Sequence, residues 1–198
     1  MLDAYEFFDA SLRVLMDFNS RVERISGLWF GDLGVERAAS FHLCEGLFET
    51  FGGQYYAVPE LEISCESGKI GLIDVCIINK QSGLVAAMVE LKRDQFENED
   101  DISRLRRVKR ASEITSKFPK KIAVSSNTII AVGSIWHRFE RQTDSILAEM
   151  RSRSRKYEDR FRWRFSAAMH HRGQECFGAT MLAIDEVAPD PNSGGDRA

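Results

Sequence analysis

The chain has 198 residues, of which 43% are hydrophobic and 29% are charged, an ordinary composition for one soluble globular domain. No run reaches the roughly 18 apolar residues of a membrane-spanning helix, and the acidic, amphipathic first residues do not resemble a signal peptide. Four scattered cysteines without a CxxC pair are expected to be small core residues of a reducing compartment, and they argue against disulfides and a zinc site. We therefore expect a cytoplasmic protein that does not bind a membrane.

Charge is unevenly distributed along the chain, although the formal net charge is only −3. Residues 1–100 carry 8 Lys/Arg against 18 Asp/Glu, whereas residues 101–172 carry 18 against 7. A basic segment that follows an acidic half suits a phosphate backbone as partner. The alternative is that the basic segment pairs with the acidic half of the same molecule.

Two helices are expected before the first strand. Apolar residues recur at helical spacing over residues 2–25, which predicts an amphipathic N-terminal helix within residues 1–26 that packs on the domain or on a partner. A second helix is expected over residues 35–51, since Gly52-Gly53 follows its last apolar residue.

Residues 54–92 predict three strands. Pro59 interrupts the first, over residues 54–63, and indicates an edge strand or a bulge. The next segment reads GLIDVCIINKQSGLVAAMVELK and predicts a hairpin, because NKQSG separates two apolar runs. Since strand side chains alternate, Glu90 and Lys92 share one face, and pairing through the turn brings Asp74 level with Glu90. Such charges on an apolar sheet are costly unless something such as a divalent metal ion neutralises them.

Asp74, followed after 15 intervening residues by Glu90-Leu91-Lys92, resembles the active-site signature of the PD-(D/E)xK nuclease superfamily. That group includes restriction endonucleases and Holliday-junction resolvases, and Ile73 stands here where the name-giving proline would be. The resemblance covers residues 33–135 and implies a restriction endonuclease-like core. It also implies hydrolysis of phosphodiester bonds in DNA, with RNA as the second choice.

The resemblance assigns roles to these residues. Asp74 and Glu90 would hold Mg²⁺ or Mn²⁺, with the main-chain carbonyl of Leu91 as a further oxygen ligand. The metal would activate a bound water, and Lys92 would orient that water or stabilise the transition state.

Members of the superfamily often carry an additional acidic residue upstream, and four residues compete for that role here. Glu36 ranks first, because it lies near the buried stripe of its helix and belongs to a G-V-E-R segment at the helix start. Glu45 ranks second, Glu49 lies one helical turn beyond it, and Glu60 would approach from the first strand. Each helical glutamate is otherwise an exposed surface residue.

A basic helix is expected after the hairpin. Ile102, Leu105, Val108 and Ala111 recur at three-residue spacing and predict an apolar stripe. The other faces carry the candidate phosphate-binding residues Arg104, Arg106, Arg107, Lys109 and Arg110. They contact nucleic acid in one interpretation and are simply solvated in the other.

The rest of the chain predicts strands over residues 120–124 and 128–135, a long helix over residues 136–165 and a last strand over residues 177–184. Residues 189–198 are expected to be a disordered tail. The second half of the long helix is rich in arginine and aromatic residues, typical of nucleic-acid contacts. Its candidate residues are Arg151, Arg153 and Arg155.

Together these elements predict an α/β domain over residues 1–188, with a central mixed sheet of four or five strands flanked by helices. Its core would be residues 33–135, and residues 136–188 would form a C-terminal helical extension and the last strand. The expected function is that of a metal-dependent nuclease, as a homodimer if both strands of a duplex are cut. The alternatives are a non-catalytic nucleic-acid-binding protein on the same fold and a partner-binding protein that uses its basic helices.

Overall fold

The protein is seen in a computed structural model that describes residues 1–26, 36–65, 68–93, 99–110, 113–116, 121–139, 148, 152 and 161–186. Its helices are α1 (Ala4–Ser26), α3 (Glu36–Phe51) and α4 (Glu99–Arg110). Its strands are β1 (Tyr55–Cys65), β2 (Gly68–Asn79), β3 (Leu84–Arg93), β4 (Glu113–Ser116), β5 (Lys121–Phe139), β6 (Phe161–Arg172) and β7 (Glu175–Glu186). None of these helices is long and apolar enough to cross a membrane.

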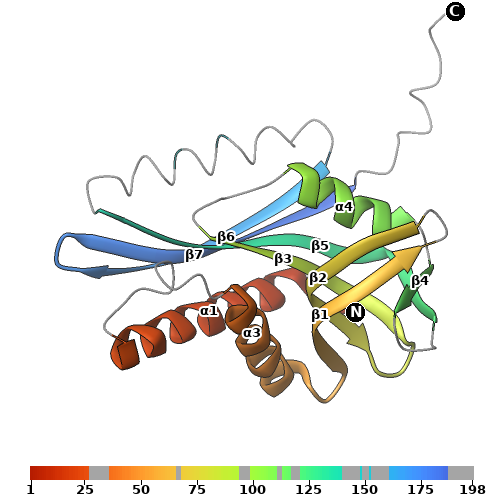
Figure 1. Cartoon of the computed structure of the whole chain (residues 1–198), viewed down its shortest axis with the longest axis horizontal. Helices are drawn as coiled ribbons and strands as arrows, with labels where there is room; N and C mark the ends of the chain where they lie inside the picture. Colours follow the sequence, from red (N-terminus) through yellow and green to blue (C-terminus); the bar gives the residue numbers. More distant parts are fainter. Residues whose placement is uncertain are drawn as a thin grey trace, which may run out of the picture.

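Six strands form one open mixed sheet in the order β1-β2-β3-β5-β7-β6 (Figure 1). Strands β3 and β5 are parallel and are connected through α4, whereas the other pairings of the described strands are antiparallel. The four-residue strand β4 adds short pairings with β1 and with the start of β5. The chain is therefore an α/β protein, with more strands than the four or five expected.

Helices cover both faces of the sheet, with α1 and α3 on one side and α4 on the other (Figure 1). Helix α1 begins at the side chain of Asp3, whose Oδ1 accepts hydrogen bonds from the amides of Tyr5 and Glu6. One buried core contains Phe7 and Phe8 of α1. A second core lies beneath α4, so the sheet carries two apolar layers.

The hairpin of β2 and β3 forms as predicted. Asn79 Oδ1 accepts hydrogen bonds from the amides of Gln81 and Ser82, at 3.0 and 2.9 Å, and so closes the turn. Gly83 follows at φ +69°, a conformation that glycine adopts without strain. The helices predicted over residues 2–25 and 35–51 and the last strand are also confirmed.

Strand β5 corrects two expectations. The predicted strands 120–124 and 128–135 are one strand, because the intervening residues form a bulge that stays in the sheet. Thr128 Oγ1 donates to the Val85 carbonyl at 2.7 Å and accepts from the amide of Ser125 at 3.2 Å. The strand then continues through Trp136 to Phe139, since β7 pairs with it along residues 130–139.

The helix predicted over residues 136–165 is wrong at both ends, where β5 and β6 are strands. The sequence FRWRF, which opens β6, alternates apolar and basic residues with the period of a strand. Arginine occurs in both helices and strands. The high content of arginine and aromatic residues therefore could not distinguish a helix from a strand here. Arg151, Arg153, Arg155 and the tail 189–198 lie outside the described residues.

Candidate functional site

The register of the hairpin brings the predicted acidic pair together. Val75 pairs with Val89 and Cys76 with Met88, so the next position along places Asp74 level with Glu90. The Leu91 amide donates a hydrogen bond to Asp74 Oδ2 at 2.6 Å. The expected juxtaposition of the two carboxylates is thus confirmed.

Glu90 is a buried carboxylate at the centre of this region. Its side chain is only 2% exposed, and its Oε2 atom lies 2.5 Å from Nη2 of Arg104. The other oxygen, Oε1, is buried and has no hydrogen-bond partner among the described residues. Burial raises the pKa of Glu90 from 4.5 to about 8, and repulsion from Asp74 adds to the increase. The charges of Arg104 and Lys92 oppose the shift without cancelling it.

Lys92 reaches this carboxylate cluster from the same face of β3. Its Nζ atom lies 2.9 Å from Asp101 Oδ2, and Asp101 Oδ1 accepts a hydrogen bond from Arg104 Nη2 at 3.0 Å. Burial alone would lower the pKa of Lys92, but the hydrogen bond to Asp101 and the nearby carboxylates outweigh it, so the pKa is raised. Lys92 therefore stays cationic, and Asp101 holds both positive groups.

We call Asp74, Glu90, Lys92, Asp101 and Arg104 the α4-face cluster. Fully ionised, its three carboxylates and two cations leave a formal charge of −1 on this face.

Helix α4 places two of these residues by burying its apolar stripe. Ile102, Leu105 and Val108 pack into the core beneath the helix, as their spacing predicts. Asp101 and Arg104, three residues apart on the flank of that stripe, then meet the strand residues. The sequence analysis did not identify Asp101 as a site residue; its spacing of three residues from Arg104 is the signal that was available.

The upstream glutamates lie elsewhere. Glu36 is exposed in the first turn of α3, which covers the sheet face opposite α4. Glu60 lies level with Asp74 across the β1–β2 pairing, and its φ of +46° confirms an irregularity beside Pro59. Its carboxylate, however, is paired with Arg37 of α3 at 3.0 Å. The structure therefore brings neither of these glutamates to Glu90.

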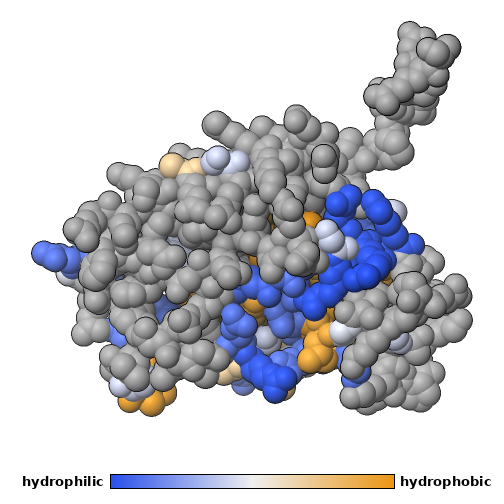
Figure 2. Space-filling view, turned by 45° about the horizontal axis from the view of Figure 1, so that its top comes forward, coloured by the Kyte–Doolittle hydropathy of each residue, from blue (hydrophilic) through white to orange (hydrophobic). Residues whose placement is uncertain are grey.

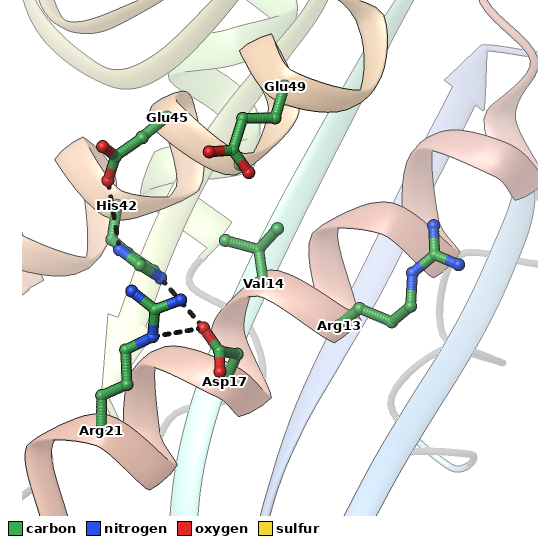
Figure 3. Close-up of a pocket in the computed structure, with 8 residues that line it drawn as sticks. Arg13, Val14, Asp17, Arg21, His42, Glu45 and Glu49 are labelled. Carbon is green, nitrogen blue, oxygen red and sulfur yellow. Dashed lines mark ion pairs between the residues drawn. The ribbon is translucent and has the colours of Figure 1, made fainter.

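Glu45 and Glu49 line a separate cavity of about 260 Å³ between α1 and α3 (Figure 3). Here the ring of His42 lies between two carboxylates, with Nε2 3.6 Å from Asp17 Oδ2 and Nδ1 3.6 Å from Glu45 Oε2. Asp17 is also paired with Arg21 at 2.7 Å. We call this the α1–α3 groove; its glutamates belong to it and not to the α4-face cluster.

The outer side of α4 is strongly basic, as predicted. Arg107 and Arg110 are exposed, while Arg106 and Lys109 are half-buried. A shallow groove of about 560 Å³, lined by Asp101, Ser103, Arg104 and Arg107, opens beside the cluster. Figure 2 shows the hydrophilic surface that gathers over this part of the molecule.

The donor set can be tested against a hard divalent cation. Among the residues that the structure describes, no three carboxylate, imidazole or thiolate groups surround one point. Asp74 and Glu90 supply two carboxylates, and the unpartnered Oε1 of Glu90 is an acceptor without a donor. Few oxygen ligands suit Mg²⁺, which keeps several of its waters. The two carboxylates fit such an ion, and the Leu91 carbonyl is a further ligand that the resemblance implies.

The described cysteine thiols offer no alternative chemistry. Cys44 and Cys76 are free and buried, and burial raises the pKa of both thiols to about 12. Both are therefore protonated core residues and weak nucleophiles, consistent with the expected structural role.

No family model, curated protein or solved structure matches this chain.

Proposed function

We propose that the protein is a metal-dependent nuclease that hydrolyses phosphodiester bonds of DNA. One observation carries the proposal: Glu90 is buried with an unpartnered oxygen beside a second carboxylate and a lysine. Strongly perturbed carboxylates next to specific charges are typical of functional sites. The resemblance of Asp74 and Glu90-Leu91-Lys92 to the PD-(D/E)xK signature supports the same conclusion.

The proposed mechanism divides the work among the residues of the cluster. Asp74 and Glu90 would hold Mg²⁺ or Mn²⁺, which supplies an activated water and offsets charge on the phosphate. Lys92 is held near the carboxylates by Asp101, so its ammonium is oriented before substrate arrives. It would stabilise the charge that develops during hydrolysis. The basic side of α4 would bind the phosphate backbone next to the site.

A second function is favoured by the ion pairs within the cluster. Arg104 and Lys92 already neutralise much of the negative charge of Glu90 and Asp101. In a non-catalytic nucleic-acid-binding protein, the acids would hold α4 on the sheet while its arginines contact phosphates. Such a protein binds DNA in a salt-sensitive way and needs no metal.

A cleavage assay on linear, circular and single-stranded DNA distinguishes the two functions. We expect cutting in Mg²⁺ or Mn²⁺ that EDTA stops and that Lys92→Ala abolishes. Lys80→Ala is the matched control, since Lys80 lies in the turn at the far end of the same hairpin. Binding of DNA at low salt without cutting supports the second function. If the protein neither binds nor cuts DNA, both functions are contradicted.

A further inference from the structure

We propose that Arg104 and the divalent cation compete for the Glu90 carboxylate, so that metal binding transfers Arg104 to a phosphate of the nucleic acid. The inference rests on the proposed function and gives that site a control element. Arg104 would then act as a metal-sensitive phosphate-binding residue, beyond the general backbone contact expected of the basic helix.

The first argument is that Arg104 is held incompletely. Among the described residues, a single nitrogen of Arg104, Nη2, makes both ion pairs, to Glu90 Oε2 at 2.5 Å and to Asp101 Oδ1 at 3.0 Å. An arginine that is committed to a carboxylate usually uses two parallel hydrogen bonds. Here Nε of Arg104 and Oε1 of Glu90 are both buried without a partner. This pairing therefore leaves hydrogen-bonding capacity unused on both sides.

The second argument is the charge of the α4-face cluster. A metal ion binds the deprotonated form of Glu90. The five ionised groups then carry a formal charge of −1, which a divalent cation would change to +1. A guanidinium beside the same carboxylate would then be repelled by the ion. One phosphodiester group, with its single negative charge, would restore neutrality, and arginine binds phosphate well.

The third argument is that a groove lies beside Arg104 into which its side chain can move. Its side chain is 24% exposed although Glu90 is buried, so part of the Arg104 side chain reaches solvent. The groove of about 560 Å³ beside it is lined by Arg104 and by the exposed Arg107 one turn further along α4. Asp101 keeps Lys92 in place through Oδ2 after Arg104 has moved.

Mn²⁺ binding to the full chain without DNA tests the competition, measured by titration calorimetry. Arg104→Met removes the competing charge and keeps an unbranched side chain, and Arg107→Met is the matched control on the same helix. We expect Arg104→Met to bind Mn²⁺ roughly tenfold more tightly than wild type, because no charged hydrogen bond has to be broken. Arg107→Met should match wild type.

Equal or weaker Mn²⁺ binding by folded Arg104→Met overturns the competition. If wild type binds Mn²⁺ and cuts DNA in that case, the proposed function stands and only this inference fails. If neither wild type nor Arg104→Met binds Mn²⁺, the metal site and the proposed function fail together.

A second measurement does not depend on the stability of Arg104→Met. In wild type labelled with ¹⁵N-arginine, the Nε–H signal of Arg104, assigned with Arg104→Lys, should shift on addition of Mg²⁺ while that of Arg107 stays unchanged. Adding a short DNA duplex should then shift the Arg104 signal again. An Arg104 signal that does not respond to saturating Mg²⁺ overturns the inference.

Discussion

The α4-face cluster and the α1–α3 groove contain the same kinds of residues in different surroundings. On the α4 face, Glu90 is 2% exposed and Asp101 8% exposed. In the groove, the side chains of Asp17 and Glu45 are 45% and 71% exposed. Exposed ion pairs are worth about 0–1 kcal/mol, whereas a buried carboxylate that is not fully paired is strongly destabilising. The buried Glu90 carboxylate therefore requires a functional explanation, whereas the exposed carboxylates of the α1–α3 groove do not.

The largest expected difference between the two regions is in cleavage. Asp74→Asn removes one carboxylate charge from the cluster and keeps the shape of the side chain. Cleavage should fall by at least about 100-fold. Asp17→Asn makes the same change in the groove and should leave the rate unchanged. Initial rates of cutting of a labelled duplex measure both. Equal rates in the two variants would remove the distinction between the regions.

The second difference is in the pH dependence of stability. The pKa of Glu90 in the folded protein is about 8, above its ordinary 4.5, so the folded state binds this proton more tightly than the unfolded state. The contribution of Glu90 to the stability of the folded state is fully present below about pH 4.5 and is lost as pH rises through 8. Over that window the free energy of unfolding should decrease by an amount on the order of 5 kcal/mol from this group.

Urea unfolding at pH 5 and pH 8.5 measures this decrease, with Glu90→Gln and Glu45→Gln as comparisons. Glu90→Gln should reduce the loss of stability between the two pH values, whereas Glu45→Gln should retain it. Lys92 contributes in the same direction only at higher pH, because its raised pKa keeps its stabilisation until the solution is alkaline. Identical pH dependence in wild type and Glu90→Gln would contradict the assigned burial.

The smallest expected effect concerns packing in the groove. A Cβ atom at Gly46 would lie 2.4 Å from Cγ2 of Val14, so Gly46→Ala forces α1 and α3 apart. We expect a loss of about 1–3 kcal/mol in the free energy of unfolding, with unchanged cleavage below the melting temperature. Thermal unfolding measures it, and Gly53→Ala, whose Cβ would contact nothing within 4 Å, is the control. A loss of cleavage in folded Gly46→Ala would mean that the two regions are coupled.

The sequence predicted the parts of the fold that depend on local patterns. Two apolar runs around a polar turn set the register that brings Asp74 level with Glu90, and three-residue spacing located the buried stripe of α4. Asp101 was missed because its role depends on how the helix lies on the sheet, which no local pattern specifies. The continuation of β5 from Trp136 to Phe139 depends in the same way on pairing with β7, whose partner residues are 36 to 42 positions away in the chain.

The most direct test of the central claim is Mn²⁺-dependent nicking of circular duplex DNA by wild type, Glu90→Gln and Glu45→Gln, assayed side by side. The two variants make the same chemical change, one in the buried cluster and one in the groove. We predict that wild type and Glu45→Gln nick the DNA at the same rate and that Glu90→Gln does not nick it. Nicking by Glu90→Gln at the wild-type rate would contradict the claim that the α4-face cluster is the catalytic site.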